Sequence, residues 1–212
     1  MLTSNGEPNK KTKTMRDLQK LCRDVARELA RLYSTISHED LDELASLLIP
    51  MKFQKNQLIL GEGEICENFY YIHKGLIRQF YVKNGKEVTE HLGVEGGMIY
   101  CIESLFKEEP TRLQIESLEQ SILFAIPKKQ LEQVAMHNQN IQILYRKILE
   151  RSLINSQVHA DLVRFETAQD RYKRFFKMHP QVSLREPLVY IASYLQMTPE
   201  TLSRVRAVTL ID

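Results

Sequence analysis

The residues best suited to recognition chemistry lie near the C-terminus, in the stretch TPETLSRVRA that begins at Thr198. A helix over this stretch places Glu200, Ser203 and Arg204 on one exposed side, because residues three and four apart are neighbours on a helix. An arginine can give two parallel hydrogen bonds to a guanine edge, a glutamate can accept from a cytosine amino group, and a serine can serve either base. The combination is typical of a helix that reads bases in the major groove of DNA, and Arg206 adds a further cation to its exposed positions.

A second candidate is the stretch MIYCIESLFKEEPTRLQIES, residues 98–117. It holds a short apolar run, one glutamate before an acidic turn with a proline, and then an arginine. Such a set could hold a small charged molecule, or it could only close a protein core. The residues by themselves leave both interpretations open.

Other reactive side chains do not form a recognisable constellation. The sequence has no Ser/His/Asp order with a supporting motif, no P-loop and no dinucleotide fingerprint, so we expect no enzyme. Cys22, Cys66 and Cys101 are far apart and include no CxxC, which argues against an iron–sulfur cluster and indicates free thiols in a reducing cytoplasm. His73 and His91 are not a His-x-His pair, so neither a haem ligand set nor a metal site is predicted.

Composition and charge are those of an ordinary globular protein, with one asymmetry. Of the 212 residues, 43% are apolar and 26% charged, and no apolar run is long enough to cross a membrane. The polar, basic N-terminus is not a secretory signal, so we expect a cytoplasmic protein without a membrane partner. Residues 1–31 carry eight basic against four acidic side chains, residues 32–163 thirteen against eighteen, and residues 164–212 eight against five. The basic ends hint at a polyanionic partner.

The predicted secondary structure that positions these residues changes twice along the chain, from helix to strand and back to helix. Residues 15–33 show one helical apolar stripe, and Ser37 opens a second short helix with a capping box. From Pro50 onward short runs rich in aromatic and β-branched residues alternate with Gly, Asn and Pro, as in an antiparallel sandwich or barrel. Asn84-Gly85 predicts a tight hairpin. After Pro127 helical spacing returns, with one short helix over residues 128–136.

A long helix is predicted from about residue 138 to residue 165. No Pro or Gly interrupts it, and about 25 residues would span about 37 Å, more than a small barrel needs to cover itself. We therefore expect one face to pair with a second copy of the protein, through Ile141, Leu144 and Ile148. The alternative is a long helix that packs only on its own domain.

The last fifty residues predict a helix-turn-helix after a basic helix over residues 167–178. Two short helices join at a tight turn, with the small Ala192 where they cross and Thr198 as the N-cap of the second, followed by Pro199. The turn has Gln196 where glycine is usual, so a non-glycine residue must adopt a left-handed conformation at a cost of about 1–2 kcal/mol. A helical hairpin used only for packing would show similar spacing.

A barrel, a long helix and a helix-turn-helix, in this order, resemble the cyclic-AMP receptor protein/fumarate–nitrate regulator (Crp/Fnr) family of bacterial transcription factors. GEICENFYYIHKGLIRQFYVKNGKE is similar to the barrel core of that family, and TPETLSR to its recognition helix. The resemblance covers about residues 50–210. It implies an α+β fold: an N-terminal cyclic-nucleotide-binding-like β jelly-roll barrel, a long dimerisation helix and a C-terminal winged-type helix-turn-helix domain.

The resemblance also implies roles for single residues. The Glu200-x-x-Ser203-Arg204 pattern resembles the oxygen-sensing branch, whose members read TTGA-type half-sites, so these three side chains are expected to read bases. Thr198 and Thr201 fall at positions whose hydroxyls touch phosphate, and we add Arg206 to the backbone contacts. A homodimer, double-stranded DNA and RNA polymerase are the implied partners.

The effector loop departs from the family pattern. Cyclic-nucleotide binders hold the phosphate with Gly-Glu at a helix start and Arg-Ser or Arg-Thr after the turn. When this loop is aligned with the family pattern without gaps, Cys101-Ile102 takes the place of Gly-Glu and Arg112-Leu113 that of Arg-Ser. Only the arginine of the pattern is therefore present, and Glu103 lies one residue after the position of the pattern's glutamate. We therefore predict no cyclic nucleotide, while an unidentified small effector stays open. The alternative is a cyclic-nucleotide-responsive regulator with a shifted phosphate cassette.

The expected organisation is an N-terminal helical segment (1–36), an effector barrel (37–136), a dimerisation helix (137–165) and a DNA-binding domain (166–212). Two rival functions remain. A cupin-like metal-dependent enzyme would share the jelly roll but needs converging histidines and carboxylates. A regulatory cyclic-nucleotide module of the kind found in kinases or channels would lack the helix-turn-helix.

Overall fold

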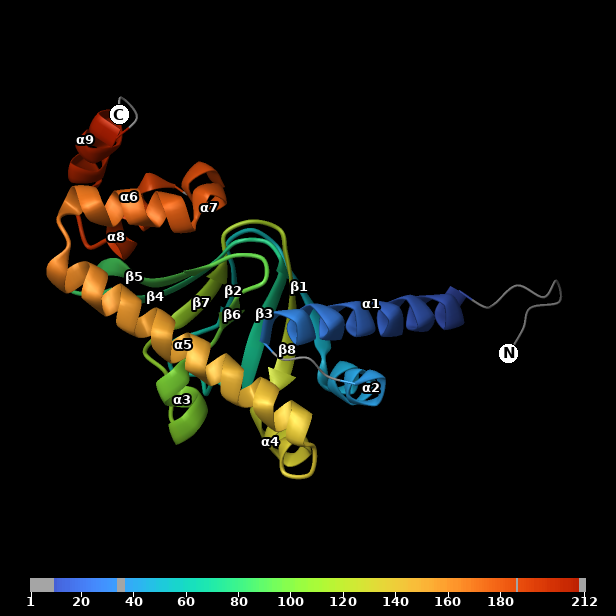
Figure 1. Cartoon of the computed structure of the whole chain (residues 1–212). Helices are drawn as coiled ribbons and strands as arrows, with labels where there is room; N and C mark the ends of the chain where they lie inside the picture. The colour runs from blue at the N-terminus through green and yellow to red at the C-terminus, as the bar shows by residue number, and fades with distance from the viewer. Residues whose placement is uncertain (1–9, 34–36, 186, 210–212) are drawn as a thin grey trace.

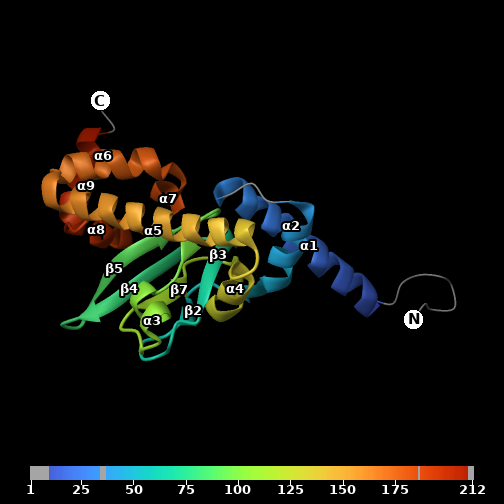
Figure 2. The ribbon, with the colours of Figure 1, turned by 60° about the horizontal axis from the view of Figure 1, so that its bottom comes forward.

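The computed structural model describes residues 10–33, 37–185 and 187–209. A β-barrel forms the centre, with N-terminal helices on one side and C-terminal helices on the other (Figure 1). A long helix crosses between the two sides, and Figure 2 shows the same order after rotation. Helices α1 (Lys10–Tyr33) and α2 (His38–Leu47) precede the barrel strands, α3 (Ile102–Lys107) interrupts them, and α4 (Lys128–Ala135) follows the last strand.

The barrel consists of two four-stranded antiparallel sheets, ordered β1-β8-β3-β6 and β2-β7-β4-β5. The expected jelly-roll sandwich is therefore confirmed, and so is the hairpin at Asn84-Gly85, where both residues have the positive φ that its tight turn requires (53° and 73°). The strands are β1 (Ile49–Phe53), β2 (Gln57–Leu60), β3 (Asn68–Lys74), β4 (Ile77–Lys83), β5 (Lys86–Gly93), β6 (Met98–Ile99), β7 (Gln114–Ser117) and β8 (Ser121–Pro127).

Helices α1 and α2 belong to the barrel core. Val25 and Leu29 of α1 and Leu44 of α2 are fully buried in the same apolar cluster as the strands. The predicted capping box is present, since the Ser37 side chain accepts from the Asp40 backbone N–H and the Asp40 carboxylate accepts from the Ser37 N–H. The described part of residues 1–36 thus packs as an outer layer of the effector barrel.

The long helix α5 (Gln139–Phe165) starts at Asn138, whose side chain accepts hydrogen bonds from two backbone N–H groups of the first turn. Our assignment of a dimer seam to Ile141, Leu144 and Ile148 is wrong for these three residues. They are 0%, 0% and 1% exposed within the single chain, because the first half of α5 lies along the barrel and packs into its core. The exposed apolar side chains lie in the second half, at Leu153, Ile154 and Phe165.

Four helices follow: α6 (Ala168–Met178), α7 (Pro180–Arg185), α8 (Leu188–Tyr194) and α9 (Pro199–Thr209). The helix-turn-helix pair is present as α8 and α9. The expected winged-type domain is not observed in the described residues after Phe165, which form helices and no strand. Helix α7 lies between α6 and the helix pair. No helix in the described part of the chain has the length and apolar character needed to cross a membrane.

Candidate DNA-reading helix and effector loop

The turn between α8 and α9 brings the two helices into close contact. Ala192 is fully buried at the crossing, where a larger side chain would separate the helices. Gln196 has φ of +51°, as predicted from the missing glycine. The Met197 N–H donates to the Ala192 carbonyl at 2.9 Å, which closes the turn. The relative angle of the two helices is therefore set by backbone hydrogen bonds and one small residue.

Helix α9 begins as the sequence predicts. The Thr198 hydroxyl accepts from the Thr201 N–H at 3.2 Å, which is an N-cap bond, and Pro199 occupies the first helical position. Leu202, fully buried, anchors the inner face of α9.

The outer face of α9 presents the predicted polar residues. Glu200, Ser203 and Arg204 are exposed, as is Thr198, whereas Thr201 and Arg206 are half-buried. The Arg204 guanidinium lies 3.4 Å from the Thr201 hydroxyl. Hydrogen bonds from its own backbone N–H and then from Thr198 lower the pKa of Glu200, so its carboxylate is an acceptor at neutral pH. The arrangement offers donors and acceptors together on one helix face, as base reading requires.

The C-terminal helices are docked on the barrel, an arrangement that the sequence did not predict. Arg78 of β4 is 1% exposed, and its guanidinium lies 4.2 Å from the Phe80 ring centre and 3.9 Å from that of Tyr190 on α8. It also donates to Thr89 at 3.0 Å, Glu87 at 2.7 Å and Glu116 at 2.9 Å. Arg78 is thus shared between the barrel and α8. The sequence signal was an arginine, followed by Gln79, inside the largely apolar run LIRQFYV.

Two further contacts hold this junction. Arg185 at the end of α7 pairs with Glu95 at 3.1 Å and with Glu119 of the barrel. The Thr89 backbone N–H donates to the Ser193 hydroxyl of α8 at 2.8 Å. The apolar cluster beneath them joins both parts: Leu76, Leu92 and Leu118 from the barrel, and Leu162, Tyr172, Phe175, Val182, Ile191, Ala192, Leu195 and Leu202 from the helices.

The charged groups of the effector loop face outward. Helix α3 starts after Cys101, and Ile102 at its first position is 52% exposed. The Glu103 carboxylate pairs with the Lys107 ammonium at 2.7 Å, with side-chain exposures of 67% and 59%. Arg112 is exposed and Leu113 half-buried. The structure therefore does not bring Glu103 and Arg112 together on the inner side of the loop.

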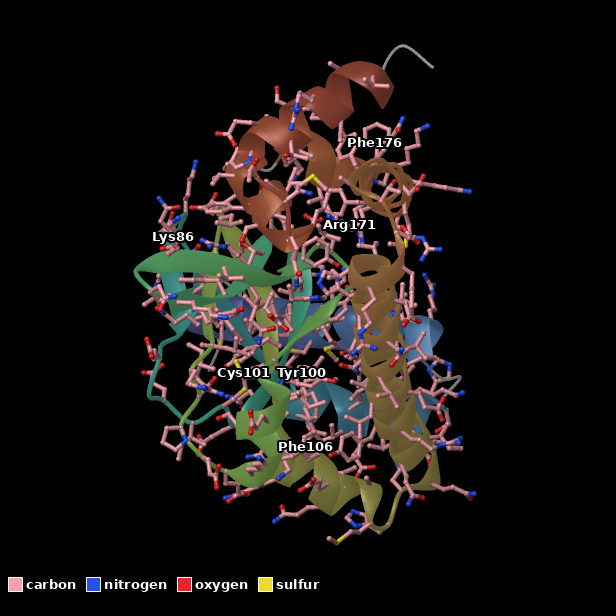
Figure 3. All side chains as sticks on the ribbon, turned by 90° about the vertical axis from the view of Figure 1, so that its left-hand side faces the viewer. Lys86, Tyr100, Cys101, Phe106, Arg171 and Phe176 are labelled. Carbon is pink, nitrogen blue, oxygen red and sulfur yellow. The ribbon has the colours of Figure 1, made fainter. Side chains whose placement is uncertain are left out.

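The inner side is closed by hydrogen bonds within the protein. Cys101 is 1% exposed, and the Gln79 side-chain amide donates to its sulfur and to the Tyr100 carbonyl, both at 3.2 Å. The Ser104 hydroxyl accepts from the Cys66 N–H at 2.9 Å. Figure 3 shows Tyr100 and Cys101 at the start of α3 and Phe106 toward its far end. The aromatic rings of Phe69, Tyr100, Phe106 and Tyr145 pack edge to face beside them.

The histidines of the barrel do not converge. His73 lies 3.3 Å from Glu28 of α1 and packs on Phe124. His91 faces the opposite side, where burial first and then His159 and His179 lower its pKa to about 4. Within the described residues no group of three or more His, Cys, Asp and Glu side chains is placed to hold a metal ion. The arrangement gives no support to a cupin-like centre.

Comparison with known proteins agrees with this architecture. Residues 50–138 match the model of the cyclic nucleotide-binding domain. FixK2 from Bradyrhizobium japonicum is 21% identical, with a TM-score of 0.65 over 76% of this chain and 83% of its own. The Thermus thermophilus catabolite activator protein is 20% identical, with a TM-score of 0.53 over 85% of each chain. The c-di-GMP-responsive global regulator CLP of Xanthomonas campestris is 14% identical, with a TM-score of 0.61 over 83% and 93%.

A search of curated protein sequences found no match. The domain match and the structural neighbours together show a cyclic nucleotide-binding fold followed by C-terminal helices.

Proposed function

We propose that this chain is a sequence-specific DNA-binding transcription regulator that acts as a homodimer and does not respond to a cyclic nucleotide. The observation that carries the proposal is helix α9. It exposes Glu200, Ser203 and Arg204 on one face while its other face is anchored by the buried Leu202.

The proposed DNA site is an inverted repeat of TTGA-like half-sites, read through residues 198–208. Arg204 would contact the guanine with two hydrogen bonds, and Glu200 would accept from the cytosine of the paired strand. Thr198, Thr201 and Arg206 would contact phosphates and so set the register of the helix without reading sequence. This assignment is supported by the side on which each residue lies in α9.

Dimerisation is supported by the second half of α5. Leu153 and Ile154 are 72% and 61% exposed, and Phe165 is 80% exposed. Apolar side chains gathered on one helix favour burial against a second copy. Two copies joined along α5 would present two α9 helices to half-sites about one helical turn, about 34 Å, apart.

The loss of cyclic-nucleotide binding is supported by the effector loop. A phosphate needs an arginine and helix N–H groups aimed at one point, with a carboxylate for the ribose. Here Arg112 is exposed and Glu103 is paired with Lys107. The Gln79 side-chain amide donates to the Cys101 sulfur at 3.2 Å, so these two groups satisfy each other within the protein.

The match to the cyclic nucleotide-binding domain favours a second candidate, a cyclic-nucleotide-responsive regulator with a shifted phosphate cassette. Isothermal titration of the purified chain with cyclic AMP and cyclic GMP separates the two. We expect no binding heat up to millimolar nucleotide. Binding that Arg112→Ala abolishes would establish the second candidate.

A gel-shift assay on a TTGA-type inverted repeat tests the DNA assignment. Arg204→Ala should weaken binding by about 1–3 kcal/mol per half-site, about 5- to 150-fold, and should relax the preference at the guanine. Thr201→Ala should weaken specific and non-specific DNA alike. Arg146→Ala, whose side chain is 62% exposed on α5, is the matched control and should leave the affinity unchanged. Unchanged binding by the Arg204 variant would refute the assignment of α9.

We also propose RNA polymerase as the partner of the DNA-bound dimer, as the function requires. Pull-down of polymerase on DNA carrying the inverted repeat, with and without the protein, tests this contact.

A further inference from the structure

A groove of about 620 Å³ runs between α1 and α2, on the side of the barrel away from the C-terminal helices (Figure 1). Its described lining comes from residues 16–50, so the effector loop takes no part in it. Pockets for small ligands typically measure about 300–1,000 Å³. The groove is therefore large enough for a ligand, and it is separate from both sites described above.

The floor of the groove is apolar. Cys22 and Leu48 are buried there, and the Cys22 thiol donates to the Leu48 carbonyl at 3.6 Å, which ties α1 to the end of α2. Ala45 and Pro50 are half-buried, and Leu18 is 46% exposed. Covering such side chains with a hydrocarbon chain removes apolar surface from water, which favours binding.

The charged side chains of the groove are mostly cations. Four cations and two carboxylates line it: Arg16, Lys20, Arg23, Arg27, Asp24 and Asp42. Asp42 accepts two hydrogen bonds from Arg23, at 2.5 Å and 2.7 Å. Asp24 accepts one from Arg27, at 2.5 Å. In the described part of the chain no ion pair involves Arg16 or Lys20, so the groove keeps two cations that no carboxylate compensates.

These two cations lie close together. Arg16 and Lys20 are exposed and four positions apart on α1, so they are neighbours on one face of that helix. Asp17, also exposed, is not among the lining residues. A guanidinium group matches the two oxygens of a carboxylate, and an ammonium group adds a further donor. The groove therefore combines an apolar floor with a place for one anionic head group.

We propose that this groove binds one medium-chain fatty acid as a free monomer. The carboxylate pairs with Arg16 and Lys20, and the hydrocarbon chain covers Leu18 and the floor around Leu48. The site needs only α1, α2 and the start of β1. The inference is therefore independent of the DNA assignment and of the effector loop.

Isothermal titration of the full chain with decanoate, kept below the concentration at which it forms micelles, tests the proposal. We expect one binding site per chain. Over hexanoate, octanoate and decanoate, each added methylene should tighten binding by up to about fourfold. Decyltrimethylammonium has the same chain length and the opposite charge, and it should bind at least about tenfold more weakly than decanoate.

Variants of the groove assign the head-group site. Arg16→Gln and Lys20→Gln should each weaken decanoate binding by about 2- to 5-fold, the size expected for an exposed ion pair. Arg16→Glu/Lys20→Glu should weaken it at least about tenfold and remove the preference over decyltrimethylammonium. Lys83→Glu/Lys86→Glu makes the same change of charge on the exposed β4–β5 hairpin, away from α1 (Figures 1 and 2), and should leave binding unchanged.

Several results would overturn the proposal. The first is the absence of binding heat up to millimolar decanoate, and the second is equal affinity for decyltrimethylammonium. Unchanged decanoate affinity in Arg16→Glu/Lys20→Glu would place the ligand elsewhere on the chain. Co-sedimentation with phosphatidylglycerol vesicles without binding of monomeric decanoate would mean that the cations contact a membrane surface instead. Circular dichroism checks that each variant is folded, and the titrations of the wild type decide without them.

Discussion

Arg78 should couple the barrel to the helix-turn-helix pair, and its replacement by methionine should destabilise the protein strongly. Its guanidinium is 1% exposed and lies between the Phe80 and Tyr190 rings, 4.2 Å and 3.9 Å from their centres. Arg78→Met keeps much of the volume of the side chain but removes its charge. Glu116, with 15% of its side chain exposed, is then left near the junction without this cation.

The magnitude follows from burial. Removing one partner of a buried ion pair costs about 3–5 kcal/mol, since the other charge remains desolvated. Glu87 is 51% exposed and can turn to water, so we expect the lower end, about 3 kcal/mol. A desolvated cation–π contact is worth about 2 kcal/mol, which sets the expected coupling between Arg78 and Tyr190.

A double-mutant cycle with Arg78→Met, Tyr190→Leu and the double variant measures that coupling. Urea unfolding followed by circular dichroism gives the free energy of unfolding for each protein. The double variant should be about 2 kcal/mol more stable than the sum of the single losses predicts. Arg146→Ala, an exposed arginine on α5, should change stability by less than about 0.5 kcal/mol.

Additive losses would refute the reasoning. A coupling below about 0.5 kcal/mol would mean that Tyr190 does not rest on Arg78 in solution, and that the docked position of α8 contributes nothing to stability. Arg78→Lys is informative in the same assay. It keeps the charge but lacks the planar group that stacks on both rings, so it should recover only part of the loss.

Three further changes have expected outcomes. Gly75→Ala should lower the urea midpoint and cost at least about 3 kcal/mol, because Gly75 has φ of +115° and an added Cβ would lie 2.0 Å from the Ser121 hydroxyl oxygen. Gln196→Gly should raise the thermal midpoint, gaining up to about 1 kcal/mol, since it removes left-handed strain at the cost of a more flexible unfolded chain. Asp40→Asn should remove an acid-dependent part of the stability. Hydrogen bonds from Ser37 first, then from Asn140 and Asn138, lower the pKa of Asp40 from 3.8 to about 2, so its contribution is present above pH 3.8 and disappears as the pH falls through about 2.

Each of these three substitutions has a control variant or a measurement that could contradict its prediction. Gly85→Ala shares the positive φ but meets no atom within 4 Å, so a loss equal to that of Gly75→Ala would contradict the steric argument. Gln196→Ala keeps the strained conformation and should not stabilise. For Asp40, the stability gap between wild type and the asparagine variant is measured by urea unfolding from about pH 5 to about pH 2, and a gap that does not shrink would contradict the assignment.

Helix α9 could be predicted from the sequence because the signals for its start and its buried face are local. An N-cap threonine, a proline at the first helical position and apolar residues at helical spacing all act within a few residues. The same local logic correctly predicted the Asn84-Gly85 hairpin, the Ser37 capping box and the left-handed Gln196.

The predicted dimer contact on α5 shows where prediction from local sequence patterns fails. Apolar periodicity identifies which residues avoid water, but not which neighbour covers them. Ile141, Leu144 and Ile148 follow the helical pattern that a dimer would need, and the barrel covers them instead. Leu153 and Ile154 of the same helix stay exposed because they lie on another side of it, whereas Leu162, farther along, is buried again beneath the docked C-terminal helices.

The barrel strands, the long helix and the exposed polar face of α9 are determined by the sequence itself, because turns, caps and side-chain alternation depend on residues that are close along the chain. The burial of Arg78 under Tyr190 depends on a contact between residues 112 positions apart. Such contacts exist only once the two sheets close and the C-terminal helices dock on them. Tertiary packing therefore decided which arginine is buried and which apolar side chains of α5 stay exposed.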